Sequence, residues 1–235
     1  MTLEPVVQIR QVRKQYHGLR PLRLMELTVG AGERVALSGL DAGAAEVFVN
    51  LVTGASVPDE GDVVVFGQST ASITDGDAWL ASLDRFGIMT PRAVLLDSAT
   101  LLQNLAMPAT LDIEPVKPDV AARVTALAQD VGIDAQWLER PIAALDAGIQ
   151  ALAHFARAIA LDPALLILEH PTAGLPPGQA KAFGETVARV TAARSLTTLI
   201  VSQDADFSSA AATRRLALDP ATGEVKPVRR RFWSL

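Results

Sequence analysis

The stretch from Arg34 to Gly54 constrains the fold of this chain more than any other segment. It begins with a short apolar run at residues 34–38 and continues through a turn of small residues. It then becomes an apolar helix that we expect to begin near Gly43. A short apolar run bounded by turn residues is typical of a buried strand, and apolar residues at helical spacing predict a helix. The sequence therefore predicts a strand–turn–helix unit of the kind that builds α/β folds.

The turn of this unit has the frame of a phosphate-binding loop, G-x-x-x-x-G-K-[ST], but lacks the side chains that give the loop its chemistry. Gly39 takes the first glycine position, and the loop continues through Gly43. Ala44 then replaces the second glycine, Ala45 the lysine, and Glu46 the serine or threonine. In such loops the lysine reaches the phosphates and the hydroxyl holds Mg²⁺. This chain keeps the frame of the loop but lacks both the lysine and the hydroxyl.

Two acidic residues near this turn indicate that the loop can satisfy itself. Glu46 places a carboxylate where a phosphate would otherwise bind, and Asp41 can add a second one. A helix N-terminus favours negative charge by roughly 0.3–1 kcal/mol per exposed group, so an internal acid can occupy the field that recruits phosphate. An ordinary strand–turn–helix that never bound phosphate remains an alternative on this stretch alone.

Composition excludes several classes of function. The chain has 235 residues, a net charge of −5 and 49% hydrophobic residues, and it has no cysteine. Thiolate metal sites, disulfides and a cysteine nucleophile are therefore unavailable, and a mildly acidic chain is a poor candidate for binding nucleic acid. The start of the chain shows no signal peptide, and no apolar run reaches the roughly 18–20 residues that cross a bilayer. We expect a cytoplasmic protein, held to the inner face of the cell membrane only through a partner.

The order of the predicted elements indicates an α/β fold with a helical insertion. We expect strands at 6–16, 22–29, 34–38, 62–67, 86–90, 165–168 and 198–202, one or two edge strands around 219–223, and helices at 78–83, 98–107 (capped by Ser98), 119–131, 146–161 and 177–193. Apolar strands separated by helices predict a mainly parallel sheet, here with an antiparallel β edge. We place one α/β core at 1–90 and 156–235 and a helical subdomain at 91–155.

Taken together, the motifs resemble the nucleotide-binding subunit of ATP-binding-cassette (ABC) transporters, a P-loop NTPase fold, over nearly the whole chain. Seven frames of that family occur in order: Tyr16, Gly39–Glu46, Pro91, Leu145–Ile149, Leu161–Leu168 with Glu169 and His170, Pro171–Leu175, and Val201–Asp204. The resemblance lies in the order and spacing of these frames more than in their functional letters.

The resemblance implies a role for each of these positions. Tyr16 corresponds to the aromatic residue that stacks on adenine, and Pro91 corresponds to the lid glutamine. In the signature L-S-G-G-Q, Asp146 corresponds to the serine and Gly148 to the second glycine. Glu169 corresponds to the Mg²⁺-side aspartate, His170 to the catalytic glutamate and Gln203 to the switch histidine. In the family, two subunits meet head to tail and each signature caps the nucleotide of the other. Asp146 would place a carboxylate against that nucleotide's phosphate, which is repulsive.

Several of these residues keep a second interpretation. Tyr16 can stack on adenine or simply cover a strand end. His170 can act as a general base, although we favour a packing or hydrogen-bonding role. Glu169 can hold Mg²⁺ only weakly, because its hydroxyl and lysine partners are missing. The tail Arg229–Trp233 is basic and aromatic, and it can touch a membrane or partner or fold back on the sheet.

From these substitutions we predict an ABC-type subunit that does not hydrolyse ATP, with a structural or regulatory role in a transporter-type assembly. We expect no resident cofactor, only weak ATP and Mg²⁺ binding, and pairing with itself or a homologous cassette. A leucine-rich segment, residues 91–107, can still dock a membrane permease subunit. Two alternatives remain open: an atypical ATPase that is active only with a competent partner cassette, and a soluble dimeric scaffold without a permease.

Overall fold

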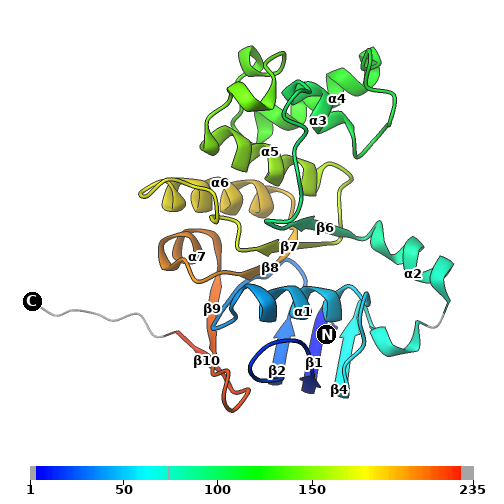
Figure 1. The fold of residues 1–235 in the computed structure, drawn as a ribbon, viewed down its shortest axis with the longest axis vertical. Helices are drawn as coiled ribbons and strands as arrows, with labels where there is room; N and C mark the ends of the chain where they lie inside the picture. Colours follow the sequence, from blue (N-terminus) through cyan, green and yellow to red (C-terminus); the bar gives the residue numbers. More distant parts are fainter. Residues whose placement is uncertain (1–3, 74, 229–235) are drawn as a thin grey trace, which may run out of the picture.

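The computed structural model describes residues 4–73 and 75–228, which form two sheets and seven α-helices in layers (Figure 1). The strands are β1 (Val7–Lys14), β2 (Leu22–Val29), β3 (Arg34–Ser38), β4 (Glu60–Val65), β5 (Gln68–Ser69), β6 (Phe86–Met89), β7 (Leu165–Glu169), β8 (Thr197–Val201), β9 (Arg214–Leu218) and β10 (Val225–Pro227). The helices are α1 (Ala42–Val52), α2 (Gly76–Leu83), α3 (Leu101–Ala106), α4 (Pro118–Asp130), α5 (Ala147–Ile159), α6 (Ala180–Ala193) and α7 (Ala205–Ala211).

The central sheet has the strand order β10-β9-β3-β8-β7-β6. All its pairings are parallel except that of β10 with β9. Side chains of β7 alternate between two cores: Leu166 and Leu168 join the core with the helices α3 to α7, whereas Leu165 and Ile167 join the core around α1. A parallel sheet covered on both faces needs strands that are apolar throughout, which explains the uninterrupted run at 165–168.

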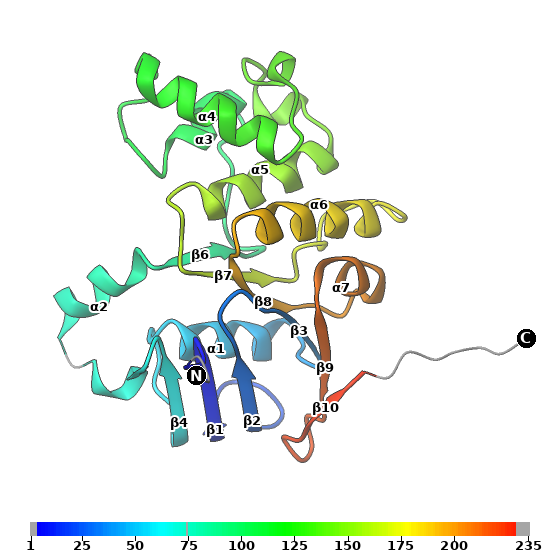
Figure 2. The same cartoon turned by 180° about the vertical axis from the view of Figure 1, so that it is seen from behind.

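A second sheet is antiparallel throughout and has the strand order β2-β1-β4-β5. Helix α1 lies between the two sheets in both views (Figures 1 and 2). Its buried side chains, among them Ala45, Phe48 and Val52, share one core with Ile9 and Leu24 of the antiparallel sheet. The predicted mainly parallel sheet with an antiparallel β edge is therefore confirmed.

The helices α3, α4 and α5 form a separate layer above the strands β6 and β7 (Figure 2). This layer corresponds to the predicted helical insertion at 91–155. The predicted boundary between 155 and 156 falls inside α5, which continues without a break from Ala147 to Ile159. The helix therefore belongs to both parts: it packs against β6 of the central sheet as well as on α3 and α4.

Several details differ from the sequence prediction, four of them in ways that the structure explains. Helix α3 is capped by Thr100 rather than Ser98, because the Thr100 hydroxyl accepts from the backbone N–H of Gln103 while the Gln103 side chain accepts from the Thr100 N–H. Helix α6 begins at Ala180, three residues later than expected. Helix α7, capped by Asp204, was not predicted. Strand β9 is not an edge strand, since β3 and β10 pair with its two sides.

Of the helices in the described ranges, none is both long enough and apolar enough to span a membrane. The tail Arg229–Trp233, for which the sequence left open a membrane or partner contact or a return onto the sheet, lies outside the described residues.

Candidate functional site

The loop between β3 and α1 needs a glycine at its first position. Gly39 has a φ of +96°, and a Cβ added there would lie 2.2 Å from the carbonyl oxygen of Leu218 in β9. Both the left-handed backbone and the close approach exclude a side chain. Gly39 is therefore explained by the packing of the loop against β9, whether or not a phosphate binds.

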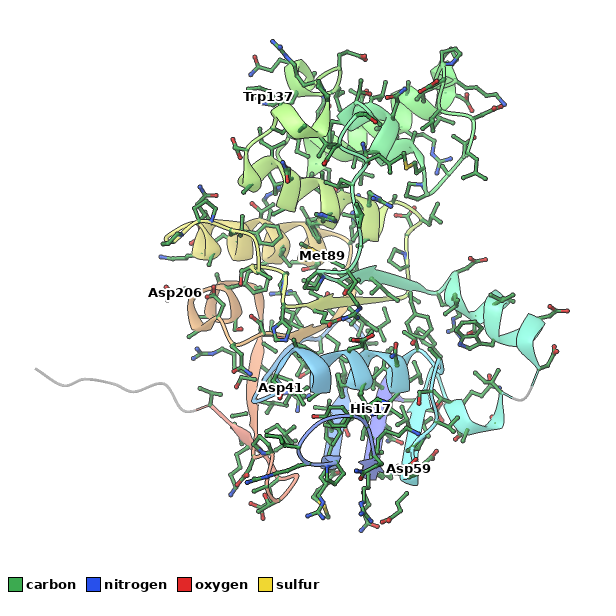
Figure 3. The ribbon with its side chains drawn as sticks, viewed as in Figure 1. His17, Asp41, Asp59, Met89, Trp137 and Asp206 are labelled. Atoms are coloured by element: carbon green, nitrogen blue, oxygen red, sulfur yellow. The ribbon has the colours of Figure 1, made fainter. Side chains whose placement is uncertain are left out.

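Two donors of this loop are satisfied by side chains of the chain itself. The Asp41 carboxylate accepts from the backbone N–H of Ala44 at 2.8 Å and so caps α1, at whose end it is labelled in Figure 3. The side-chain amide of Gln203 accepts from the N–H of Gly39 at 3.4 Å and donates to the carbonyl of Leu40 at 2.8 Å. Backbone N–H groups of the loop and of the helix N-terminus are what would hold a phosphate, and here one of each, at Gly39 and at Ala44, already has a side-chain acceptor.

The ring of Tyr16 lies beside the same loop. It packs partly against the core around α1, and a Cβ added to Gly43 would lie 3.5 Å from its Cε2 atom. Partial burial raises the pKa of the Tyr16 hydroxyl, and the nearby Asp41 carboxylate raises it further. Tyr16, Gly39, Asp41, Ala44 and Gln203 all line one cleft of about 560 Å³. The structure thus brings together the adenine, phosphate-loop and switch positions.

Arg92, which follows Pro91 in the loop after β6, was not identified from the sequence. Its guanidinium donates to both carboxylate oxygens of Glu169, at 2.7 and 2.6 Å. It also lies 3.6 Å from the carboxylate of Glu46 on α1. The hydrogen bonds and charge of Glu169, together with the charge of Glu46, raise the pKa of Arg92. The carboxylates at the two Mg²⁺-side positions are therefore joined by a cation from the chain itself.

The clue to Arg92 was present in the sequence. Glu169 directly follows the apolar run 165–168 that predicts a buried strand, and a buried acid needs a counter-charge. Arg92 is the residue directly after the lid position, so it was the nearest basic candidate. Proline at position 91 is exposed and supplies no side-chain amide.

His170 begins the turn after β7 and lines a second pocket of about 200 Å³, together with Pro91 and Glu169. Within the described part of the chain, its Nε2 atom is buried and has no hydrogen-bond partner. His154 of α5 lines the same pocket, and burial, reinforced by the charge of Arg157, lowers its pKa. The pocket thus contains two imidazoles at the junction between the helical layer and the sheet.

The signature position forms the N-terminus of α5. The Asp146 carboxylate accepts from the backbone N–H of Ile149 at 2.9 Å and caps the helix. A Cβ added to Gly148 would lie 3.0 Å from Oε1 of Gln179 and 3.1 Å from Oδ1 of Asp146. Asp146 is exposed, and in the single chain its carboxylate serves its own helix.

The leucine-rich segment after Pro91 is divided between core and surface. Leu95, Leu101 and Leu105 are buried in the helical-layer core, so these three side chains are not part of any docking surface, and docking of a permease by the segment 91–107 stays a prediction. Val94 and Leu96 remain outward-facing, 71% and 48% exposed. The leucine content alone could not distinguish core residues from surface residues, because a short helix buries one face and exposes the other.

Comparison with known proteins identifies the family to which this fold and loop belong. The sequence profile of the ABC transporter family matches residues 22–173, well over half of the chain. The chain belongs to the ABC transporter family. The matched segment runs from β2 to the turn after β7 and includes the phosphate-loop frame, Arg92, the signature position and Glu169.

Curated relatives are ATP-binding proteins of bacterial transport systems. A methionine import ATP-binding protein of Brucella abortus is 27% identical over 93% of this chain, and a phosphonates import ATP-binding protein of Anaeromyxobacter dehalogenans is 32% identical over 82%. This chain spans 58% and 40% of their lengths, respectively. The ATP-binding protein of a lipoprotein-releasing system from Alcanivorax borkumensis is 29% identical, with 87% of this chain and 91% of that protein covered.

Solved structures of ABC cassettes share the fold. The cbiO1 subunit of an ABC transporter complex from Clostridium perfringens superposes with a TM-score of 0.79 and 19% identity, covering 95% of this chain and 87% of that one. A dimeric cassette in a post-hydrolysis state with ADP and phosphate has a TM-score of 0.75 and 19% identity, covering 95% and 99%. The ABC-type P-loop NTPase fold predicted from the sequence is thus confirmed.

ABC cassettes are expected to hold Mg²⁺ and a nucleotide, and the residues of this chain do not fit that metal. The carboxylates of Glu46 and Glu169 are both next to the Arg92 guanidinium, which occupies the space between them. Across residues 4–73 and 75–228, no cluster of three or more His, Asp or Glu side chains could hold a metal ion. Mg²⁺ needs oxygen ligands that are not already compensated by a fixed positive charge.

Proposed function

We propose that this chain is a non-hydrolysing ABC subunit, a pseudo-ATPase with a structural or regulatory role in a transporter-type assembly. The observation that carries this proposal is that two N–H groups of the phosphate loop already have side-chain acceptors. Asp41 occupies the N–H of Ala44, and Gln203 occupies the N–H of Gly39. A bound nucleotide would have to displace both side chains without gaining a lysine, since residue 45 is alanine and fully buried.

Loss of catalysis follows from the same side chains. Phosphoryl transfer depends almost wholly on positioning and on charges that stabilise the transferring phosphoryl group. Arg92 forms an ion pair with Glu169, so its charge is already neutralised by the chain itself and is not directed at a phosphoryl group. His170, at the position of the catalytic glutamate, begins a turn with a positive φ of 42°. We therefore propose that this chain binds nucleotide only weakly and does not turn it over.

The partners we propose follow from relatives rather than from a contact in this chain. Among the solved cassettes with this fold, some are dimers, and the curated relatives belong to import or release systems. We propose that this chain pairs with itself or with a homologous cassette, on the cytoplasmic face of a membrane. The exposed Val94 and Leu96 beside a groove of about 160 Å³, lined by Phe86, Ala93, Arg157 and Leu161 among others, offer a surface for a permease subunit.

Phosphate release by the purified chain tests the proposal. We expect no magnesium-dependent release of phosphate from ATP above the level of the variants Glu169→Gln and His170→Ala. Magnesium-dependent turnover that either substitution abolishes would show that the site is catalytic and would overturn the proposal. Turnover that appears only when a cassette with intact motifs is added, and that exceeds the activity of that cassette alone, would favour the alternative of an ATPase completed by its partner.

A further inference from the structure

The ion pair of Arg92 connects residues 90–100, which we call the lid loop, to the core. Its cation, Arg92, belongs to the loop between β6 and α3, and its anions belong to two separate elements of the core. Glu169 ends β7 and is 1% exposed, whereas Glu46 lies in α1 and is 48% exposed. In the family frame, these are the two protein positions on the Mg²⁺ side of the site.

We propose that the Arg92 guanidinium replaces the divalent cation of this site and permanently fixes the lid loop to the core. A buried carboxylate at position 169 needs compensation, and two charge-assisted hydrogen bonds in a fork geometry provide it. The guanidinium remains charged at all physiological pH values. Unlike Mg²⁺, the guanidinium is covalently attached to the chain, so this contact forms without a bound nucleotide. The proposal concerns the conformation of the nucleotide-free chain, and its test does not use ATP hydrolysis as a readout.

The segment that Arg92 fixes is also attached to the helical layer. The Arg157 guanidinium of α5 donates to the carbonyl of Val94 at 2.7 Å. The buried Asn104 side chain of α3 accepts from the N–H of Leu96 at 2.8 Å and donates to the Leu96 carbonyl at 3.1 Å. Residues 92–96 are thus tied to the core at one end and to α3 and α5 at the other. Arg92 is therefore a positioning residue that sets the helical layer against the sheet.

Thermal unfolding with and without Mn²⁺ tests this role. The variant Arg92→Ala leaves Glu169 and Glu46 without their shared cation, and we expect its unfolding midpoint to fall on the order of 5 °C. Because the two carboxylates are then free, millimolar Mn²⁺ should restore part of the loss, whereas it should leave the native chain unchanged. Arg92→Lys keeps the charge but not the fork, so its midpoint should lie between the two with no response to Mn²⁺.

Two controls separate this effect from the loss of any surface ion pair. Arg13 has the same side-chain exposure as Arg92, 45%, and an ion pair of similar length, 2.7 Å, but its partner Glu60 is 62% exposed. Arg13→Ala should change the midpoint little and should not respond to Mn²⁺. Adding Glu46→Gln to Arg92→Ala should remove the Mn²⁺ response, since one of the two carboxylates is lost.

Hydrogen exchange gives an independent readout of the tether. Backbone amides of residues 93–100 should exchange faster in Arg92→Ala than in the native chain, and at the native rate in Arg13→Ala. The proposal is overturned if Arg92→Ala behaves like Arg13→Ala in midpoint and exchange. It is also overturned if Arg92→Ala is destabilised but gains no more from Mn²⁺ than the native chain does.

Discussion

Replacing Asp41 tests the claim that the loop before α1 is satisfied from within. Asp41 is the N-cap of α1 and accepts from the N–H of Ala44 at 2.8 Å. Loss of an N-cap side chain costs about 0.5–2 kcal/mol, of which the carboxylate's favourable interaction with the helix dipole is roughly 0.3–1 kcal/mol. Residues deeper in α1, such as Phe48 and Val52, are buried between the two sheets, so the rest of the helix should remain in place.

We therefore expect Asp41→Ala to lower the free energy of unfolding by about 0.5–2 kcal/mol, and Asp41→Asn, which keeps an acceptor, by less. Urea unfolding measures both values. Asp75→Ala is the matched control: Asp75 caps α2 at 3.1 Å, but α2 has no fully buried residue, so its loss should matter less.

A second readout comes from Tyr16, the only tyrosine of the chain. The Asp41 carboxylate contributes to the raised pKa of Tyr16, so both Asp41 variants should lower that pKa. Burial, the larger cause, remains, and the pKa should stay above the ordinary value of 10.0. The near-ultraviolet absorbance of the phenolate reports this titration. The reasoning fails if Asp41→Ala matches the native chain in stability and leaves the pKa of Tyr16 unchanged.

Two further predictions concern the contact between α5 and the sheet. The lowered pKa of His154 means that the unfolded chain takes up a proton first as pH falls, so stability should be constant above the ordinary pKa of 6.5 and decline below it. Urea unfolding between neutral pH and roughly pH 5 should show this decline, and His154→Gln should make it shallower; an unchanged slope would contradict the assignment. A Cβ on Gly87 of β6 would lie 2.0 Å from the carbonyl oxygen of Ala158, so Gly87→Ala should cost about 1–3 kcal/mol or more. The same change at Gly76, which has open space around it, should cost far less, and equal costs for the two variants would refute this packing argument.

Local patterns accounted for most of the fold. The strand at 34–38, the helix that follows it and the apolar strand at 165–168 are all written in neighbouring residues, and the structure places them as predicted. Helix caps were harder, because Ser98 and Thr100 are both good N-cap residues. Only the reciprocal partner Gln103, three residues after Thr100, distinguishes them.

The candidate site was less predictable, because its contacts join distant parts of the chain. Arg92 and Glu169 are 77 positions apart, and Gln203 and Leu40 are 163 apart. The family frame located Glu169 and Gln203, but it says nothing about which cation or carbonyl a substituted side chain will choose. Pattern alone also could not divide the run after Pro91, in which Val94 and Leu96 are exposed while Leu95 is buried.

Direct binding of ATP to the purified chain tests the central claim most directly. Calorimetry at millimolar Mg²⁺ and ATP should give no resolved heat of binding, and the melting temperature should not shift, because Asp41 and Gln203 hold two of the loop's donors and no lysine is present. Binding in the micromolar range would contradict the account. It would mean that the loop backbone and Tyr16 suffice to hold a nucleotide despite Ala45, Glu46 and the Arg92 ion pair.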